Sequence, residues 1–272
     1  MKISTYKRTN EILDKYNFKI KKSLGQNFLI DQNILKKIVD LSNIGKDTLV
    51  IEIGPGIGAL SEFILDKCGY LVMYEIDKRL IPILNDTLKD YKNFKLINED
   101  FLESDVQSDI KGLNFKEIVL ISNLPYYVTI PIITKIIEDD LPIQKLILMM
   151  QKEVAERLSA KPNTKKYNSL SIFIQYNYDV KTLMNVSRNV FYPKPNVDSS
   201  VLKLEKRKKY FVNDEKLFFR FVKEAFSQRR KMLKNNLRNF DLKKLEKIFT
   251  ELNLSLMQRA EELKIEDYIN IV

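Results

Sequence analysis

The chain has 272 residues, of which 44% are hydrophobic and 30% charged, and it carries a net charge of +10 with a pI of about 9.3. This composition is typical of a globular protein, and no apolar run approaches the ~20 residues that a membrane span needs. Because histidine is absent and Cys68 is the single cysteine, the sequence excludes an internal disulfide, a histidine-based catalytic triad and a conventional zinc site.

The N-terminal residues form the first distinct segment of the chain. Residues 1–25 contain 7 Lys and Arg against 2 Asp and Glu, and Met1–Arg8 lacks the apolar core of a secretory signal. We therefore expect residues 1–22 to be a loose basic arm. The single cysteine and the missing signal together indicate a reducing compartment, the cytoplasm, with an organelle left open.

Apolar, β-branched segments alternate with helix-period segments from about residue 34 to residue 204. Strands are expected at Thr48–Ile53, Tyr70–Ile76, Phe94–Asn98, Glu117–Ser122, Lys145–Met150, Val180–Val186 and Ser199–Leu204. Helices are expected between most of them, among others at Ala59–Lys67, Lys78–Lys89 and Gln151–Leu158. This alternation predicts an α/β fold with a seven-stranded, mostly parallel sheet and helices on both of its faces.

The first expected strand runs into a glycine-rich turn, Gly54-Pro55-Gly56-Ile57-Gly58-Ala59. Glycines let the backbone approach a ligand closely beside a helix N-terminus, although this turn also fits the pattern of dinucleotide-binding proteins. Glu75 lies twenty-one positions after Gly54, at the end of the next strand, where a carboxylate can bind two ribose hydroxyls. These features predict an adenosine-containing cofactor and leave NAD and S-adenosylmethionine both open.

Two further strand ends favour a methyl donor. Asp100 follows the third strand, where it could accept a hydrogen bond from an adenine amino group, although a solvated turn carboxylate is the simpler alternative. Asn123-Leu124-Pro125-Tyr126 ends the fourth strand, where an amide oxygen and a loop carbonyl can accept from an exocyclic amine while the Tyr ring stacks on the base. Hydride transfer has no use for such a clamp, whereas methyl transfer to an amine does.

The segment after about Lys206 lacks strand signals and keeps a helical period to the end, with Asn213-Asp214 placed to cap a helix. We expect residues 23–205 to form the α/β domain and residues 206–272 a small all-helical domain. Residues 203–240 contain 13 Lys and Arg against 4 Asp and Glu. A general bias of the sequence towards lysine could also explain the positive charge, but its clustering favours binding to a polyanionic partner.

Five segments together resemble one family of enzymes over nearly the whole chain. They are Ser23–Leu29, Glu52–Gly56, Asn123–Tyr126, Phe191–Ser199 and Phe226–Leu233. The chain is similar to the small-subunit ribosomal RNA adenine N6,N6-dimethyltransferases, and somewhat less similar to the erythromycin-resistance methylases of large-subunit rRNA. The resemblance implies a Rossmann-like, S-adenosylmethionine-dependent methyltransferase sheet. It also implies dimethylation of two adjacent adenosines in a hairpin loop of small-subunit rRNA, coupled to biogenesis of that subunit.

The resemblance also implies roles for individual residues. S-adenosyl-L-methionine, with S-adenosyl-L-homocysteine as product and without a metal, would be bound by Asn27, Leu29, Gly54, Gly56, Glu75, Ile76, Asp100, Phe101 and Asn123. The target adenine would be held by Asn123, Pro125, Tyr126 and Phe191. RNA contacts would come from Arg229, Arg230, Lys231, Lys234 and Arg238. The expected partner is small-subunit rRNA within a precursor of the 30S particle, with no membrane, and the protein is expected to be a monomer.

The sequence departs from the family pattern at Glu99 and Asn163, where glycine is usual. Neither position carries a group that the chemistry needs. Hydrogen bonds from the target amine to the Asn123 amide oxygen and the Pro125 carbonyl would localise the nitrogen lone pair, so that no strong base is required. This agrees with a chain that contains no histidine.

Three other interpretations remain open on the sequence. The same chemistry could act on large-subunit rRNA and confer macrolide resistance, although Phe226–Leu233 argues against this. The chain could be a mainly non-catalytic ribosome-assembly or RNA-binding factor, a role that can coexist with catalysis. An NAD-dependent dehydrogenase ranks last, because Asn123–Tyr126 has no place in hydride transfer.

Overall fold

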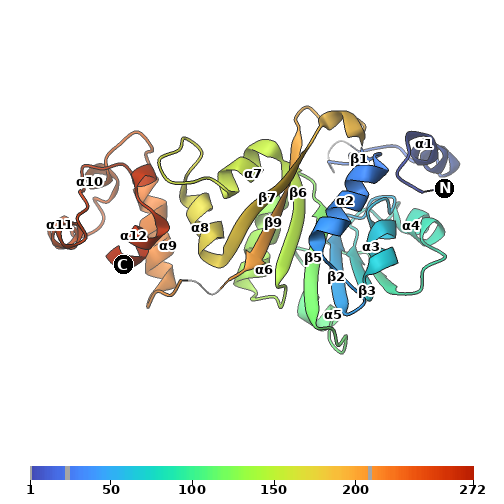
Figure 1. The fold of residues 1–272 in the computed structure, drawn as a ribbon, viewed down its shortest axis with the longest axis horizontal. Helices are drawn as coiled ribbons and strands as arrows, with labels where there is room; N and C mark the ends of the chain where they lie inside the picture. Colours follow the sequence, from blue (N-terminus) through green and yellow to red (C-terminus); the bar gives the residue numbers. More distant parts are fainter. Residues whose placement is uncertain (1, 22–24, 208–209) are drawn as a thin grey trace. The chain divides into compact units, whose positions relative to one another are not determined.

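The computed structural model describes residues 2–21, 25–207 and 210–272 (Figure 1). The expected start of the α/β domain at residue 23, and the first two residues of the Ser23–Leu29 segment, lie outside the described residues. The chain forms two compact units, which we describe separately. Unit 1 contains residues 1–152 and 181–205, and unit 2 contains residues 153–180 and 206–272.

A seven-stranded sheet has the order β4-β3-β2-β5-β6-β9-β7 (Figure 1). Its strands are β2 (Thr48–Ile53), β3 (Tyr70–Tyr74), β4 (Phe94–Ile97), β5 (Glu117–Asn123), β6 (Lys145–Gln151), β7 (Tyr178–Val186) and β9 (Ser199–Lys206). The pairs among β4, β3, β2, β5 and β6 are parallel, and β9 lies antiparallel to β6. This confirms the expected α/β class, and every expected strand lies within two residues of its observed bounds.

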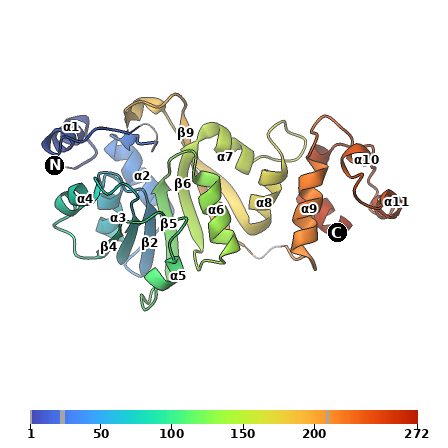
Figure 2. The same cartoon turned by 180° about the vertical axis from the view of Figure 1, so that it is seen from behind.

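Helices cover both faces of the sheet, as expected. They are α2 (Gln32–Ser42), α3 (Ser61–Lys67), α4 (Ile81–Thr87), α5 (Val106–Asp109) and α6 (Thr129–Glu138). α2 and α3 lie over the face that Figure 1 presents, and α6 lies over the opposite face, which Figure 2 presents. Leu35, Ile38 and Val39 of α2 pack with Val50 and Val119 of the sheet into the core of unit 1.

The N-terminal residues differ from the expected loose arm. Residues Tyr6–Lys15 form helix α1, capped by the Thr5 hydroxyl, which accepts a hydrogen bond from the Arg8 N–H at 3.2 Å. Ile12 and Leu13 are buried in the core of unit 1. The expectation is therefore wrong for residues 2–21, because an apolar stripe lies among the many lysines and packs against the α/β body.

A second, two-stranded sheet joins distant parts of the chain. β1 (Phe28–Leu29) pairs antiparallel with β8 (Phe191–Tyr192), with Leu29 opposite Phe191. The 3₁₀ turn η2 (Arg188–Val190) precedes β8, and the Ile30 N–H donates to the Val190 carbonyl at 2.9 Å. Sequence periodicity did not predict these strands, since two residues are too few to show a period.

Unit 2 is helical. It contains α7 (Lys152–Leu158) from Glu153 on and the first three residues of β7. Its other elements are α8 (Ser169–Asn177), α9 (Glu215–Ala225), α10 (Leu233–Asn236), α11 (Leu242–Glu251), η3 (Ala260–Glu262) and α12 (Ile265–Ile271). The Asp214 carboxylate caps α9 by accepting from the Leu217 N–H at 2.9 Å, which confirms the expected cap. No helix within residues 2–21, 25–207 and 210–272 is long and apolar enough to cross a membrane.

The units divide the chain differently from the expected domains. The expected boundary between residues 205 and 206 is also a boundary between the units, but residues 153–180 group with unit 2. The reason is packing, because Tyr167 and Tyr176 belong to the same hydrophobic core as Phe218 and Tyr268. The Tyr176 hydroxyl also donates to the Glu215 carboxylate at 2.9 Å.

Candidate active site

A cavity of about 400 Å³ lies in unit 1, within the roughly 300–1,000 Å³ range typical of small-molecule sites. It is lined by the residues that follow β2, β3, β4 and β5, which is the carboxyl edge where open α/β sheets bind ligands. All the expected cofactor and acceptor residues line it, namely Asn27, Leu29, Gly54, Gly56, Glu75, Ile76, Asp100, Phe101, Asn123, Pro125, Tyr126 and Phe191. The fold therefore brings these residues into one site.

The glycine turn after β2 has positive φ angles at Gly54, Gly56 and Gly58. Gly54 and Gly56 have φ angles of 67° and 62°, in the left-handed region that other residues rarely adopt. A Cβ atom on Gly56 would also lie 3.1 Å from the Phe28 ring. The Gly56 N–H donates to Glu75 Oε2 at 3.3 Å, so the turn holds the carboxylate at the end of the neighbouring strand.

Glu75 is the buried carboxylate of the site, with 4% of its surface exposed. Its Oε1 accepts a second backbone hydrogen bond, from the Asp77 N–H at 2.8 Å. Burial raises the pKa of Glu75 to about 7, although both N–H donors oppose this rise. Above about pH 7 the ionised form of Glu75 predominates, and an oriented pair of acceptor oxygens is then available for the hydroxyls of a ribose.

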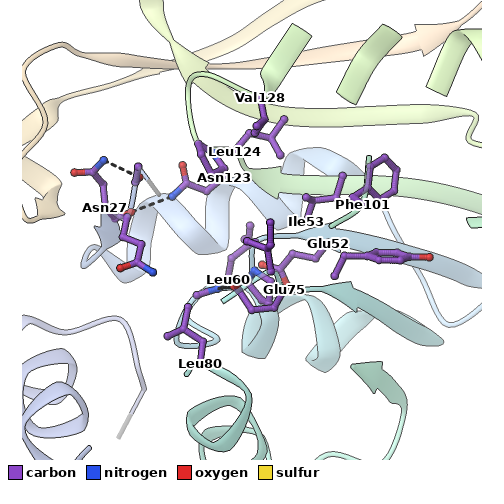
Figure 3. Close-up of a pocket in the computed structure, with 18 of the residues that line it drawn as sticks. Asn27, Glu52, Ile53, Leu60, Glu75, Leu80, Phe101, Asn123, Leu124 and Val128 are labelled. Carbon is purple, nitrogen blue, oxygen red and sulfur yellow. Dashed lines mark hydrogen bonds between the residues drawn. The ribbon is translucent and has the colours of Figure 1, made fainter. Parts of the chain in front are cut away.

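A second buried carboxyl, Glu52, lines the same cavity and was not among the expected site residues. The Ser61 hydroxyl donates to its Oε2 at 2.6 Å. Burial raises the pKa of Glu52 to about 8, and the neighbouring Glu75 adds to the effect while Ser61 opposes it. Figure 3 shows both carboxyl groups in the close-up of the cavity. A single carboxyl inside the apolar strand Thr48–Ile53 was the sequence signal that could have revealed it.

The far side of the cavity combines a polar turn with apolar surface. Asp100 lies three residues beyond the end of β4, and its Oδ1 accepts from the Leu102 N–H at 2.9 Å, which orients the carboxylate. Phe101 is buried against Tyr74, with the ring centroids 5.2 Å apart and nearly perpendicular. Ile76 lines the cavity with 54% of its surface exposed, so a flat ligand could cover it.

Asn123 is the last residue of β5, where it lies opposite Met149 of β6. Its Nδ2 donates to the Asn27 carbonyl at 3.3 Å, and the Asn27 Nδ2 donates to the Gly25 carbonyl at 3.0 Å (Figure 3). Because the Asn123 amino group is engaged in this way, its Oδ1 is the end of the amide that can accept a hydrogen bond from a ligand.

The two residues after Leu124 are also held in place. The Pro125 carbonyl accepts from the Val128 N–H at 3.2 Å and keeps a second lone pair for another donor. The Tyr126 hydroxyl lies 3.0 Å from the Ser199 hydroxyl, and burial raises the pKa of Tyr126, so its phenol stays neutral. The half-buried Tyr126 ring borders the cavity and is restrained at its far end.

Phe191 reaches the cavity from β8, paired with Leu29 of β1. Only 4% of its surface is exposed, and it belongs to the core of unit 1. It therefore forms part of the wall, whereas the more exposed Tyr126 offers a ring face to a ligand. The departure at Glu99 also lines this cavity, where its Oε2 accepts from the Ser104 hydroxyl at 3.1 Å.

The expected RNA-binding residues lie on unit 2 and are all exposed. Arg229 forms an ion pair with Glu261 at 3.0 Å, and Arg238 donates to the Asn235 side chain at 3.1 Å. In the described part of the chain, no ion pair involves Arg230, Lys231 or Lys234. These last three residues are available for phosphate groups.

The second departure from the family pattern, Asn163, lies on unit 2. Its φ angle of 63° is left-handed, and its N–H donates to the Glu261 carbonyl at 2.7 Å. Asparagine is enriched at such angles among non-glycine residues, which explains why it can replace glycine here.

Comparison with known proteins places this architecture in a family. The model of the ribosomal RNA adenine dimethylases matches residues 17–272, which is most of the chain. The chain belongs to the ribosomal RNA adenine dimethylase family. This confirms the family resemblance that the five sequence segments carry.

Two relatives agree with this assignment to the family. Ribosomal RNA small subunit methyltransferase A of Bacillus cytotoxicus is 50% identical over 277 residues, covering 98% of this chain and 94% of the relative. The protein of the same name from Bacillus mycoides is 48% identical over 280 residues, covering 99% of this chain and 96% of the relative.

Two solved structures share the fold of this dimethylase-family chain. A dimethyladenosine transferase from Plasmodium falciparum has a TM-score of 0.77 and 25% identity, covering 90% of this chain and 95% of its own. The 23S rRNA methyltransferase ErmE has a TM-score of 0.70 and 22% identity, covering 90% and 97%. These likenesses confirm the Rossmann-like methyltransferase sheet with a helical C-terminal part.

Proposed function

We propose that this chain dimethylates the N6 amino groups of two adjacent adenosines in a hairpin loop of small-subunit rRNA, with S-adenosyl-L-methionine as the methyl donor. The curated relatives that are named small subunit methyltransferases support the substrate. The observation that carries the chemistry is that the Glu75 carboxyl and the Asn123 amide line the same cavity. S-adenosyl-L-homocysteine would be the second product, and the substrate would be rRNA within a precursor of the small subunit.

The residues of the cavity fit the proposed cofactor. Glu75 would accept hydrogen bonds from the two ribose hydroxyls, and Asp100 from the adenine amino group, while Ile76 and Phe101 cover the apolar surface of the base. Gly54 and Gly56 leave room for close approach to the backbone. When bound, S-adenosyl-L-methionine supplies a methyl group on a positively charged sulfur.

The acceptor half of the cavity would hold the flipped adenine. The Asn123 Oδ1 and the Pro125 carbonyl would accept the two N–H bonds of the exocyclic amine, which withdraws its lone pair from the purine ring. The Tyr126 ring would stack on the base, a contact worth about 1–3 kcal/mol per base. The nitrogen would bond to the methyl carbon as the carbon–sulfur bond breaks, and the methylated nitrogen would then release a proton to solvent. Rate acceleration would come from orientation and electrostatics, without a general base.

Replacing Asn123 by Ala tests this role. Methyl transfer from labelled S-adenosyl-L-methionine to small subunits that lack the modification should fall about 100-fold or more, the range found when an oriented electrostatic partner is removed. Asn33→Ala, an exposed position in α2, is the matched control and should retain the wild-type rate. A wild-type rate in Asn123→Ala would contradict the mechanism.

The substrate is tested separately from the chemistry. Isolated small and large ribosomal subunits should be compared as acceptors under the same conditions. Methyl incorporation confined to the small subunit supports the proposal. Incorporation into the large subunit alone would contradict the proposed substrate but not the proposed chemistry. Cofactor binding without methyl transfer to either subunit would indicate that the chain is an assembly factor.

A further inference from the structure

Asp77 and Arg79 form an ion pair just after the proposed ribose-binding residue Glu75, with the Asp77 carboxylate buried and the Arg79 side chain partly exposed. The Arg79 guanidinium contacts both oxygens of Asp77, with Nε 2.8 Å from Oδ1 and Nη2 2.5 Å from Oδ2. Only 6% of the Asp77 surface is exposed. The Arg79 side chain lowers the pKa of Asp77, so this carboxylate is ionised. Such a two-point pair has a defined geometry that an exposed ion pair lacks.

The same pair reaches the segment that precedes β1. Arg79 Nη1 donates to the Lys19 carbonyl at 3.0 Å, and its guanidinium lies 4.6 Å from the centre of the Phe18 ring. On the other side, Gln26 Nε2 donates to Asp77 Oδ2 at 2.9 Å, and the Lys21 N–H donates to Gln26 Oε1 at 2.8 Å. Residues 18–21 and Gln26 are therefore held against the segment that follows β3.

These contacts continue into the cavity. The Asp77 backbone N–H donates to Glu75 Oε1 at 2.8 Å, so the residue that pairs with Arg79 also holds the carboxylate proposed to bind the ribose. Gln26 lines the cavity, and the adjacent Asn27 carbonyl accepts from Asn123. Neither Asp77 nor Arg79 is among the described residues that line the cavity. Any effect of the pair on a ligand must therefore pass through Glu75 and the segment it holds.

We propose that Asp77 and Arg79 are positioning residues that set the affinity for the adenosine cofactor by holding Glu75 and residues 18–21 and 25–27 in their binding arrangement. This inference rests on the proposed function. Loss of Arg79 would leave a buried carboxylate without its charged partner, and the fastened segment would have to be ordered when the cofactor binds. Cofactor binding would therefore become weaker, while the rate of methyl transfer from the bound cofactor would stay the same.

Steady-state kinetics of Arg79→Gln test the inference. We expect the KM for S-adenosyl-L-methionine to rise about tenfold, with kcat at saturating cofactor within about twofold of the wild type. Arg79→Lys keeps the positive charge but loses the planar guanidinium that contacts both carboxylate oxygens. Its KM should therefore lie between those of the wild type and Arg79→Gln. Calorimetric titration with S-adenosyl-L-homocysteine should show the same order of affinities.

The matched control is Lys15→Gln, which breaks the ion pair between Lys15 of α1 and Asp86 of α4. This pair also ties the N-terminal segment to the α4 region, yet neither residue is among the described cavity-lining residues. The control should leave the KM unchanged. An unchanged KM in Arg79→Gln and Arg79→Lys, or a lower kcat with an unchanged KM, would overturn the inference. If the wild type itself failed to bind the cofactor, the proposed function would fall first, and the inference with it.

Discussion

At the scale of single residues, the site depends on side chains whose hydrogen-bonding capacity is partly used before a ligand arrives. The Asn123 amino group is engaged by Asn27, which leaves the oxygen for the amine of a base. The Pro125 carbonyl has a turn hydrogen bond and a spare lone pair. Glu75 receives two backbone donors. At Asn123 and Pro125 the protein selects which acceptor remains for the ligand, and at Glu75 it holds the carboxylate in place, so little reorientation is needed on binding.

Glu75 predicts a pH dependence for cofactor binding. Its pKa in the free protein is about 7, and the ribose hydroxyls need the ionised carboxylate as acceptor. Affinity for S-adenosyl-L-homocysteine should therefore be nearly constant above pH 8 and fall as the pH drops through 7, by about tenfold between pH 8 and pH 6.

Calorimetric titration across this pH range checks the expectation. In Glu75→Gln the affinity should be weaker and the dependence on pH should flatten. Loss of the Glu75 charge should also lower the pKa of Glu52 in this variant, so any dependence on pH that remains reports Glu52. An equal affinity of the wild type at pH 6 and pH 8 would show that ionisation of Glu75 does not matter for binding.

At the scale of elements, short pieces of irregular backbone determine the shape of the cavity. The glycine turn after β2 delays the start of α3 to Ser61, later than the helical period suggested. Phe28 of β1 packs against that turn at Gly56. The pairing of β1 with β8 then places Phe191 in the cavity wall. These loops could not be inferred from side-chain periodicity, because each depends on a contact with a distant segment.

Gly56→Ala tests the turn. The left-handed φ should cost about 1–2 kcal/mol of unfolding free energy, and the added Cβ must displace the Phe28 ring. Gly112→Ala is the matched control, since Gly112 has a φ of 84° with nothing near an added Cβ.

Both variants should therefore lose stability in chemical denaturation. Weaker binding of S-adenosyl-L-homocysteine is expected in Gly56→Ala alone. If the two variants bound the cofactor equally well, the contact between the turn and Phe28 would have no part in binding.

At the scale of the whole molecule, charge is distributed unevenly along a chain of net charge +10. The basic stretch at residues 203–240 provides exposed cations on unit 2, including Arg230, Lys231 and Lys234. Many other lysines and arginines are engaged in ion pairs, as Lys2 is with Asp66 and Lys95 with Asp109. The available cations of unit 2 are therefore the better candidates for phosphate contacts.

Salt dependence tests this assignment. If these residues bind rRNA phosphates, the logarithm of the association constant should fall linearly with the logarithm of salt concentration. Replacing Arg230, Lys231 and Lys234 together by Gln should reduce that slope by about 2–3, close to one for each lost phosphate contact. Binding to rRNA fragments can be measured by fluorescence anisotropy.

The control is the triple replacement of Lys243, Lys244 and Lys247 by Gln in α11, where all three side chains are exposed. It removes the same charge from unit 2. It should reduce the slope of the salt dependence by less than the replacement of Arg230, Lys231 and Lys234 does. A slope near zero in the wild type would count against an RNA-binding role for the chain.

The sequence by itself determined the class of fold and most of the candidate site. Alternating apolar runs report buried strands directly, and the carboxyl ends of parallel strands meet at one edge. Gly54, Glu75, Asp100 and Asn123 could therefore be grouped from their positions alone. That inference needs only local periodicity and the rule for parallel sheets.

Only the tertiary structure decided how distant segments meet. It showed that α1 packs on the core, that residues 153–180 group with unit 2, that β1 pairs with β8, and that Asp77 and Arg79 fasten the N-terminal segment. It also revealed Glu52 as a buried neighbour of Glu75. These features arise from contacts between residues far apart in the chain, and local periodicity carries no information about which distant segment covers which surface.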